Sequence, residues 1–514
     1  MKTRTVLAAA ATALMLTLTA CGGGGSSSGS GEPQAGGDLV IARADETQSL
    51  LPTGPFDNAS IWTMEEIYDT LLVPTSDGKG VEASLATSWK QSADKLSWTF
   101  KLRKGVEFSN GKPLTSADVK FSLEQGMKPD ANVSFINQVI KSIATPDDDT
   151  VVITTKQPWA PLPADLAMFG NSIVPKDYGG KTAAEFDKKP IGTGPFMLSS
   201  WVKGESIKLV KNPHYWQSGK PYLDSVTFTV VADANTRATQ VQSGQADVDE
   251  FPAYSSLSAL DAGNTKVGTF ESSRVDYFIM NTKRKPFDDR NVRLAIAQAI
   301  DRDALIKTVQ FGHGEAAKGY MSPALWAYDD SIEPPAYDLD AAKATLAKSS
   351  VPNGFTTTLT VGSGDADEIA AAQLIQASLK KLGITVKLQT LDPSAVSDAK
   401  HAGNYDMGFT YQTTDIVDPD EIIRFAGLDN GGSNTLYTFY KDAELEKLAD
   451  KADTLSDQAA RKKIYSQIQE AINEATPYVA LYYSPSVYAY SAKVHDFHPY
   501  PTGNYNLVDT WVEH

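Results

Sequence analysis

Residues 96–119 read LSWTFKLRKGVEFSNGKPLTSADV, and this stretch decides the fold. Apolar and polar residues alternate through 96–103, which predicts a half-buried β-strand. The Asn-Gly pair at 110–111 is a turn signal. Thr115 and Asp118 then stand three residues apart ahead of an apolar run, which resembles a capping box with Asp in place of the usual Glu. A strand, a tight turn and a capped helix in this order predict a mixed α and β protein.

The second half of the chain shows the same mixture. Asp367 can cap a helix whose apolar residues share one face and which ends at Gly383. Residues 384–388 alternate immediately afterwards as a strand. A helix, a tight turn and a strand form the αβ unit of a layered sheet domain. Apolar spacing predicts two more amphipathic helices, at 291–300 and 460–472.

Composition describes a large acidic protein with one thiol. The 514 residues are enough for about three domain-sized units. The formal net charge is −16, which argues against binding to nucleic acid or docking on anionic lipid. Because the chain has a single cysteine, we expect no internal disulfide, and the core alone must stabilise the fold.

The N-terminal segment predicts export and a lipid anchor. A positively charged start precedes an apolar run at 6–18, which is shorter than the roughly 20 residues of a membrane span. Leu-Thr-Ala-Cys at 18–21 resembles the lipobox of bacterial lipoproteins, and this resemblance implies lipidation of Cys21. We therefore expect a signal peptide at 1–20 and a Gly/Ser-rich tether at 21–36. The alternative is an ordinary signal peptide with an incidental cysteine.

Motifs for catalysis and metal binding are missing from the sequence. A G-x-S-x-G match at 25–29 lies in the Gly/Ser tether, where no strand and helix can flank it. His495 and His498 could share a metal, but no third ligand is near them in the sequence. The acidic run at 147–149 is read as a solvated hairpin turn, with a carboxylate metal site as the alternative. We predict no catalytic residue, no metal site and no cofactor.

Further motifs follow the opening stretch in order along the chain. They are LATSW at 85–89, PIGTGPF at 190–196, NPHYW at 212–216, GKPYLD at 219–224, QSGQAD at 242–247, MNT at 280–282 and PFDD at 286–289. Together with 96–119 they resemble the signature of the peptide/nickel-type solute-binding proteins of ABC importers, which include dipeptide- and oligopeptide-binding proteins. We expect most of these motifs to hold the fold. The glycines at 192 and 194, for example, predict a tight turn with positive φ.

The resemblance implies an α/β, two-lobed periplasmic-binding-protein-like fold with a cleft between the lobes. The first lobe would be discontinuous, at 37–58, 189–271 and 480–514, and an extra subdomain would be inserted in it at 59–188. The second lobe would span 272–479. Solute would lie between the lobes and be enclosed by hinge closure.

One segment bears on the chemistry of the solute. Residues 411–420 read YQTTDIVDPD and are similar to the family stretch in which an aspartate meets a peptide's α-ammonium. The match assigns that role to Asp415. The neighbouring ligand-binding positions would be Gln412, Thr413 and Thr414. A carboxylate in a closing cleft is costly to desolvate unless a cation meets it, and a peptide amine supplies that cation.

The same segment has a structural interpretation. Asp415 can begin a polar turn, while Asp418 and Asp420 cap the helix that follows. The segment also departs from the family pattern, because Gln412 replaces an aromatic residue and Ile-Val at 416–417 replaces small polar residues. Since the family also includes receptors for sugars, opines and metal chelates, these solutes stay open as alternatives.

The function expected from the resemblance is capture of an extracellular solute, with a short peptide as the leading ligand, and its delivery to an ABC permease. We expect a monomer without enzymatic activity, held by lipid at the outer face of the cytoplasmic membrane through Cys21. The expected partners are the solute and the permease subunits, and not nucleic acid. The rival interpretations are a secreted lipoprotein hydrolase and a surface chaperone.

Overall fold

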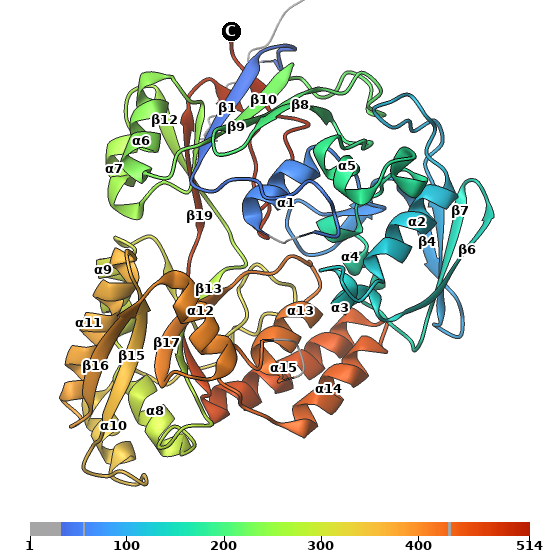
Figure 1. Ribbon diagram of the computed structural model, residues 1–514. Helices are drawn as coiled ribbons and strands as arrows, with labels where there is room; N and C mark the ends of the chain where they lie inside the picture. Colours follow the sequence, from blue (N-terminus) through green and yellow to red (C-terminus); the bar gives the residue numbers. More distant parts are fainter. Residues whose placement is uncertain (1–31, 55–56, 430–432) are drawn as a thin grey trace, which may run out of the picture. The chain divides into compact units, whose positions relative to one another are not determined.

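Two large mixed sheets organise residues 34–514, which form one compact unit (Figure 1). The computed structural model describes residues 32–54, 57–429 and 433–514. The predicted signal peptide, Cys21 and most of the tether therefore lie outside the described residues. Residues 32–37 contain no helix or strand. Within the described residues, no helix is both long enough and apolar enough to span a bilayer.

The first sheet has seven strands in the order β12-β19-β11-β1-β10-β9-β8. Its central strand β1 runs parallel to β10 and β11, and the outer strands are antiparallel. The strands are β1 (Asp38–Arg43), β8 (Phe196–Val202), β9 (Ser206–Lys211), β10 (Ser225–Val230), β11 (Val248–Glu250), β12 (Thr265–Phe270) and β19 (Ser486–Ser491). The helices beside them are α1 (Asn58–Glu65), α6 (Ala234–Ser243) and α7 (Leu257–Leu260). The short pair β20 (Val494–His495) and β21 (Trp511–Val512) follows in the C-terminal segment.

The second sheet has six strands in the order β14-β18-β13-β17-β15-β16. These are β13 (Val275–Met280), β14 (Glu315–Ala316), β15 (Thr356–Gly362), β16 (Thr385–Leu391), β17 (Met407–Gln412) and β18 (Tyr478–Tyr483). Successive residues of β13 enter two different apolar clusters, because side chains alternate between the faces of a strand. Phe278 and Met280 join one cluster, while Tyr277 and Ile279 join the other. The sheet is thus buried on both faces.

Helices cover both faces of the second sheet. They are α8 (Arg290–Gln298), α9 (Arg302–Val309), α10 (Leu339–Leu346), α11 (Ala366–Lys380), α12 (Pro393–Ala402), α13 (Asp420–Ile422), α14 (Ala443–Asp453) and α15 (Gln458–Ala475). The helices predicted at 291–300 and 460–472 are confirmed as α8 and α15. The helix predicted to start at Asp367 is α11, but Asp365 is its cap and accepts a hydrogen bond from Glu368 N at 2.8 Å. The predicted cap was therefore wrong by two residues.

A separate four-stranded sheet, β4-β5-β7-β6, carries the stretch that opened the sequence analysis. This part contains β2 (Leu72–Pro74), β3 (Val81–Ala83), β4 (Ala86–Gln91), β5 (Ser97–Leu102), β6 (Ile140–Asp147) and β7 (Thr150–Thr155). Its helices are α2 (Ser116–Gly126), α3 (Ser134–Asn137), α4 (Leu162–Asp165) and α5 (Ala183–Lys188). The capping box is confirmed, since Thr115 N and Oγ1 both donate to Asp118 Oδ2 at 2.8 Å. The acidic run at 147–149 is the β6–β7 hairpin turn, as its structural interpretation predicted.

The glycines of the PIGTGPF motif are required because they have no side chain, and not because they adopt a positive φ. Neither Gly192 nor Gly194 has a positive φ, so the predicted reason was wrong. A Cβ at Gly192 would lie 1.9 Å from the carbonyl oxygen of Ile67, and one at Gly194 would lie 2.6 Å from the carbonyl carbon of the same residue. Gly194 N also donates to Ile67 O at 3.0 Å. These glycines let two backbones touch, and this contact ties the inserted part to the first sheet.

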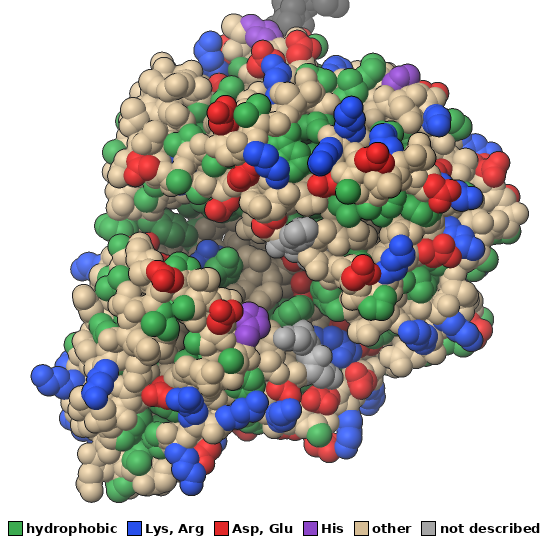
Figure 2. All heavy atoms as spheres, in the orientation of Figure 1, with side chains coloured by type: hydrophobic (Ala, Val, Ile, Leu, Met, Phe, Trp, Pro, Cys, Tyr) green, Lys and Arg blue, Asp and Glu red, His purple; other side chains and the backbone are tan. Residues whose placement is uncertain are grey.

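Two short segments connect the sheets. Residues 271–274 join β12 to β13, and residues 484–485 join β18 to β19. The predicted boundary between 479 and 480 cuts through β18, which pairs with β13 and β14 of the second sheet. We therefore keep the division into lobes as our proposal, move the end of the second lobe to Tyr483 and count α1 with the first lobe. Ile61 and Trp62 of α1 pack in the apolar cluster of the first sheet, so the predicted start of the inserted part at 59 is too early. A space-filling view shows a deep hollow between the two proposed lobes (Figure 2).

Candidate functional site

The predicted binding segment leaves the end of β17 and enters the junction between the two sheets. Gln412, the last residue of β17, pairs with Val275 of β13. Two residues later, Thr414 N donates to Ser273 Oγ at 3.0 Å. Ser273 lies in a connecting segment, and its own N donates to Pro501 O at 2.6 Å. Asp415 thus lies where the C-terminal part of the first lobe meets the second sheet.

Asp415 has a carboxylate that nothing in the described protein uses. Its backbone N and that of Ile416 donate to Glu421 Oε2 at 2.8 and 2.9 Å, so Glu421 holds the turn. Within the described residues, the Asp415 side chain makes no hydrogen bond or ion pair. Burial raises the pKa of this carboxyl to about 6. A cationic group of a ligand would stabilise the ionised form and provide the missing partner.

The neighbouring predicted residues differ in their availability. Gln412 Nε2 donates to the backbone oxygen of Thr413 at 2.7 Å, so the amide nitrogen of this side chain already has a partner in its own segment. Thr414 is fully buried, and its hydroxyl has no hydrogen-bond partner among the described residues. Tyr411 is 53% exposed, and the guanidinium of Arg274 lies 4.1 Å from its ring centroid. The structure therefore brings Thr414 and Asp415 together as groups without partners.

Asp418 and Asp420 have structural partners. Asp418 accepts from both terminal nitrogens of Arg461, at 2.7 and 2.6 Å. Asp420 pairs with Arg424 at 3.0 Å. Asp418 Oδ1 also accepts from Asp420 N at 3.0 Å, next to the start of α13. Pro419 is the N-cap of α13 and Asp420 is its first residue, so only Asp418, through its bond from Asp420 N, acts near the start of the helix as the structural interpretation expected.

Helix α1 of the first lobe brings further residues to the same junction. Trp62 lies 5.4 Å from Phe251 and 5.8 Å from Tyr505, measured between ring centroids. Ile416 and Val417 belong to the same apolar cluster as Trp62, so the segment after Asp415 packs in the core of the first lobe. The replacement of small polar residues at 416–417 by Ile and Val follows from this packing. The sequence analysis did not assign α1 to the site.

Two glutamates at the end of α1 are the clearest omission. Asn504 Nδ2 donates to Glu65 Oε1 at 2.6 Å, while Glu65 Oε2 is buried and has no partner among the described residues. Glu66 is fully buried and accepts from Leu507 N at 3.0 Å. Burial raises the pKa of Glu65 to about 8, and the charge of Asp415 contributes to the shift. The adjacent acids at the end of an otherwise uncharged, mostly buried helix were a signal that the sequence offered.

A cavity of about 510 Å³ lies beside the segment, between the inserted part and the second lobe. Ile416 and Glu421 belong to its wall, so it begins next to Asp415. Phe135 of α3 and Phe425 meet edge to face there, with centroids 6.0 Å apart. The wall combines aromatic surface with charged groups. Such a lining suits an organic solute with both apolar and polar parts.

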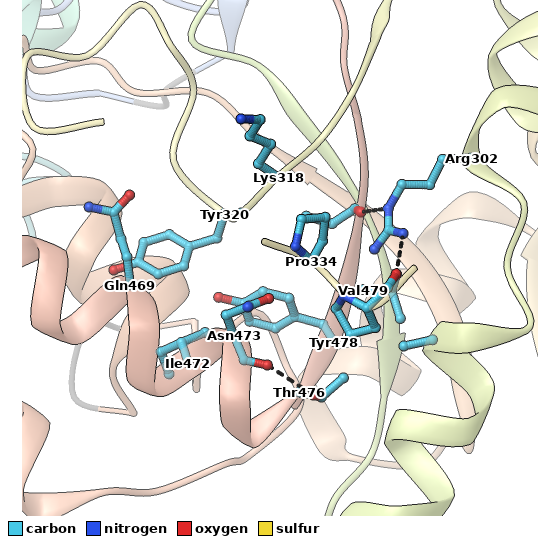
Figure 3. A pocket seen from close by; sticks show the side chains of 14 residues that line it. Arg302, Lys318, Tyr320, Pro334, Gln469, Ile472, Asn473, Thr476, Tyr478 and Val479 are labelled. Atoms are coloured by element: carbon cyan, nitrogen blue, oxygen red, sulfur yellow. Dashed lines mark hydrogen bonds between the residues drawn. The ribbon is translucent and has the colours of Figure 1, made fainter. Parts of the chain in front are cut away.

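The pocket in Figure 3 has a different character. It encloses about 20 Å³, which is room for roughly one water molecule. Arg302 uses its guanidinium there to donate to Ala480 O at 2.8 Å and to Pro335 O at 3.1 Å. These contacts tie α9 to β18 and leave no space for a solute.

Histidines and carboxylates form no metal cluster in the described part of the chain. No group of three or more His, Cys, Asp or Glu is placed to hold an ion in the ranges the structure covers. His495 stacks on Trp511 with centroids 4.1 Å apart, and its Nε2 lies 3.5 Å from Glu513 Oε2. Its contacts are those of a packing residue at the C-terminal end.

Known proteins match this chain over nearly its whole length. Residues 80–434 match the family described as bacterial extracellular solute-binding proteins, family 5 middle. The probable D,D-dipeptide-binding periplasmic protein DdpA of Escherichia coli K12 is 32% identical over 457 residues, which cover 86% of this chain and 88% of DdpA.

Two solved structures show the same fold. The ABC transporter-associated periplasmic binding protein DppA from Helicobacter pylori, in complex with peptide STSA, matches with a TM-score of 0.82 and 33% identity, covering 94% of this chain and 99% of that one. The PBP AgaA from A. tumefacien R10, in complex with agropinic acid, matches with a TM-score of 0.80 and 30% identity, covering 93% and 99%. The predicted periplasmic-binding-protein-like α/β fold is confirmed. The chain belongs to the bacterial extracellular solute-binding proteins of family 5.

Proposed function

We propose that this protein is the receptor of an ABC importer and that it binds a short peptide, with the α-ammonium against Asp415. The observation that carries this proposal is the carboxylate of Asp415, which is partly buried at the junction of the lobes and lacks a cationic partner among the described residues. A buried charge is costly unless a counter-ion meets it, so the site fits an amine. The names of two relatives, a D,D-dipeptide-binding protein and a peptide complex, support a peptide.

The receptor acts by binding alone. In this proposal ATP hydrolysis and the movement of solute across the membrane belong to the permease and its ATPase. The solute leaves this protein chemically unchanged. We further propose that lipid on Cys21 holds a monomeric receptor at the outer face of the cytoplasmic membrane. The Gly/Ser-rich residues that follow Cys21 would let the folded unit reach the permease.

An opine is the second candidate for the solute. The AgaA complex with agropinic acid supports it, because that protein is 30% identical to this chain. An opine with a basic amine nitrogen would also meet Asp415, so Asp415 alone does not separate such an opine from a peptide.

Mass spectrometry of the solute that stays bound identifies the class directly. The protein is purified gently, denatured, and the released small molecules are analysed. Peptides are the expected result, and a synthetic copy of the released peptide should raise the melting temperature without being consumed. Release of an opine, a sugar or a chelate would reject peptides. Turnover of the added molecule would reject a pure receptor.

A further inference from the structure

Glu65 is anchored in a way that leaves one of its carboxylate oxygens unused. It is the last residue of α1, and Asn504 fixes its Oε1 at 2.6 Å. Asn504 is itself fixed, because its Oδ1 accepts from Thr502 Oγ1 at 2.5 Å. Glu65 Oε2 is buried without a partner in the described part of the protein. The side chain is therefore oriented in advance, and its second oxygen is free.

A short series of contacts places Glu65 and Asp415 at one junction. Thr414 N reaches Ser273, and Ser273 N reaches Pro501 in the C-terminal segment. Three residues after Pro501, Asn504 reaches Glu65. The two carboxyl groups are close enough to interact electrostatically, since the charge of Asp415 adds to the rise in the pKa of Glu65. One carboxylate comes from each lobe.

Some buried carboxylates in this protein pair with a cation, while others, such as Asp165 and Glu250, accept from a neutral Trp or Tyr donor. Asp249 is fully buried and pairs with Arg237 at 2.8 Å. Asp418 pairs with Arg461 at 2.6 Å. By contrast, no Lys, Arg or His of the described ranges pairs with Glu65 or Asp415. A single ammonium would neutralise only one of these two acids.

We infer that Glu65 is a second solute-binding carboxylate, given by the first lobe, which favours solutes with two positive charges at one end. A peptide whose first residue is lysine or arginine has this chemistry, since its α-ammonium and side-chain cation lie a few bonds apart. The inference rests on the proposed function, because Asp415 must already face the solute.

The alternative is that Glu65 only holds Asn504. Its pKa of about 8 makes it mostly neutral at pH 7 without a solute. The titratable groups that face it are Asp415, the adjacent Glu66 and Tyr500, and none of them is a cation. A monocation would bind Asp415 and leave Glu65 protonated. A dication would ionise Glu65 as well, and close to one proton would be released on binding.

Calorimetric titration of two matched tetrapeptides separates these cases. Ser-Thr-Ser-Ala, the peptide in the related complex, is compared with Lys-Thr-Ser-Ala at pH 7 in buffers of different ionisation enthalpy. We expect at least ten-fold tighter binding of the lysine peptide and release of close to one proton with that peptide alone. In Glu65→Gln both differences should vanish while Ser-Thr-Ser-Ala still binds. Glu124→Gln, an exposed change on α2, should behave as the unchanged protein.

The remaining outcomes of the titrations also decide whether Glu65 binds the solute. Equal binding of both tetrapeptides to the unchanged protein would overturn the inference and leave the peptide function standing. A lysine preference or proton release that persists in Glu65→Gln would also overturn it. If neither tetrapeptide binds, 1,5-diaminopentane is titrated. Its binding with proton release that depends on Glu65 would support the inference and reject the peptide. Failure of all three probes to bind would reject both proposals.

Discussion

Several carboxyl groups in the folded protein bind protons more tightly than they would in an unfolded chain. Burial raises the pKa of Asp165 to about 8 and that of Glu250 to about 7. Asp69, buried beside Thr193 and Trp216, is raised to about 6. In an unfolded chain such groups ionise near pH 4. The folded state therefore holds extra protons between about pH 4 and pH 8.

The sign of the pH dependence follows from these protons. Stability falls with rising pH wherever the folded state binds more protons than the unfolded state. The stability that these acids provide is complete below about pH 4 and is lost as the pH rises towards 8. Carboxyls with lowered pKa values, such as the exposed Asp233 and the half-buried Asp289, affect stability only at lower pH. We predict that the melting temperature of the solute-free protein decreases from pH 5 to pH 8.

Scanning calorimetry at constant ionic strength measures this decrease. Asp165→Asn keeps the acceptor for Trp159 Nε1, which lies 2.7 Å from Asp165 Oδ2, and removes the titration. The variant should show a smaller slope than the unchanged protein. A melting temperature that stays level or rises over this range would contradict the assignment of raised pKa values.

Local sequence patterns predicted individual elements well. The alternation before residue 103 became β5, and the box at Thr115 and Asp118 became the start of α2, because both depend on neighbours a few residues away. The order of strands in the two large sheets depends on pairings hundreds of residues apart, which no local pattern encodes. The whole-chain resemblance supplied that information.

The site was predicted only in part for the same reason. Asp415 lies in a motif and was assigned to the proposed site, whereas Glu65 lies 350 positions earlier in the sequence and comes within its electrostatic influence only through tertiary packing. The reason given for Gly192 was also wrong, because a close approach to Ile67 is a tertiary fact. The sequence could not assign residues whose role depends on a neighbour that is far away in the sequence and close in the folded protein.

The proposed tether is an element with a separable role. Cys21→Ser removes the lipid attachment site and changes nothing in the folded unit of residues 34–514. With no other anchor proposed, this variant should appear in the soluble fraction after membranes are washed, with an unchanged melting temperature. Cell fractionation followed by immunoblotting measures the distribution, and Ser27→Ala in the same segment serves as the control. Retention of Cys21→Ser on membranes would contradict lipid anchoring.

At the scale of the whole molecule, the proposed site draws on both proposed lobes and on the segments that connect them. Asp415 comes from the second lobe, Trp62 and Glu65 come from the first, and Ser273 lies between them. A solute bound at this junction contacts both lobes at once, so binding energy is available to hold them together. In our proposal, closure and recognition therefore depend on the same few side chains.

The most direct measurement of the central claim is calorimetric titration of the identified solute into the unchanged protein and into Asp415→Asn. Asparagine keeps the shape of the side chain and removes the charge that answers the ammonium. Loss of one side of a buried charged hydrogen bond costs about 2–5 kcal/mol, so the affinity should fall roughly thirty-fold or more. Circular dichroism of both proteins verifies that the fold is unchanged. A loss of less than about 1 kcal/mol would contradict the claim that Asp415 binds the solute's cation.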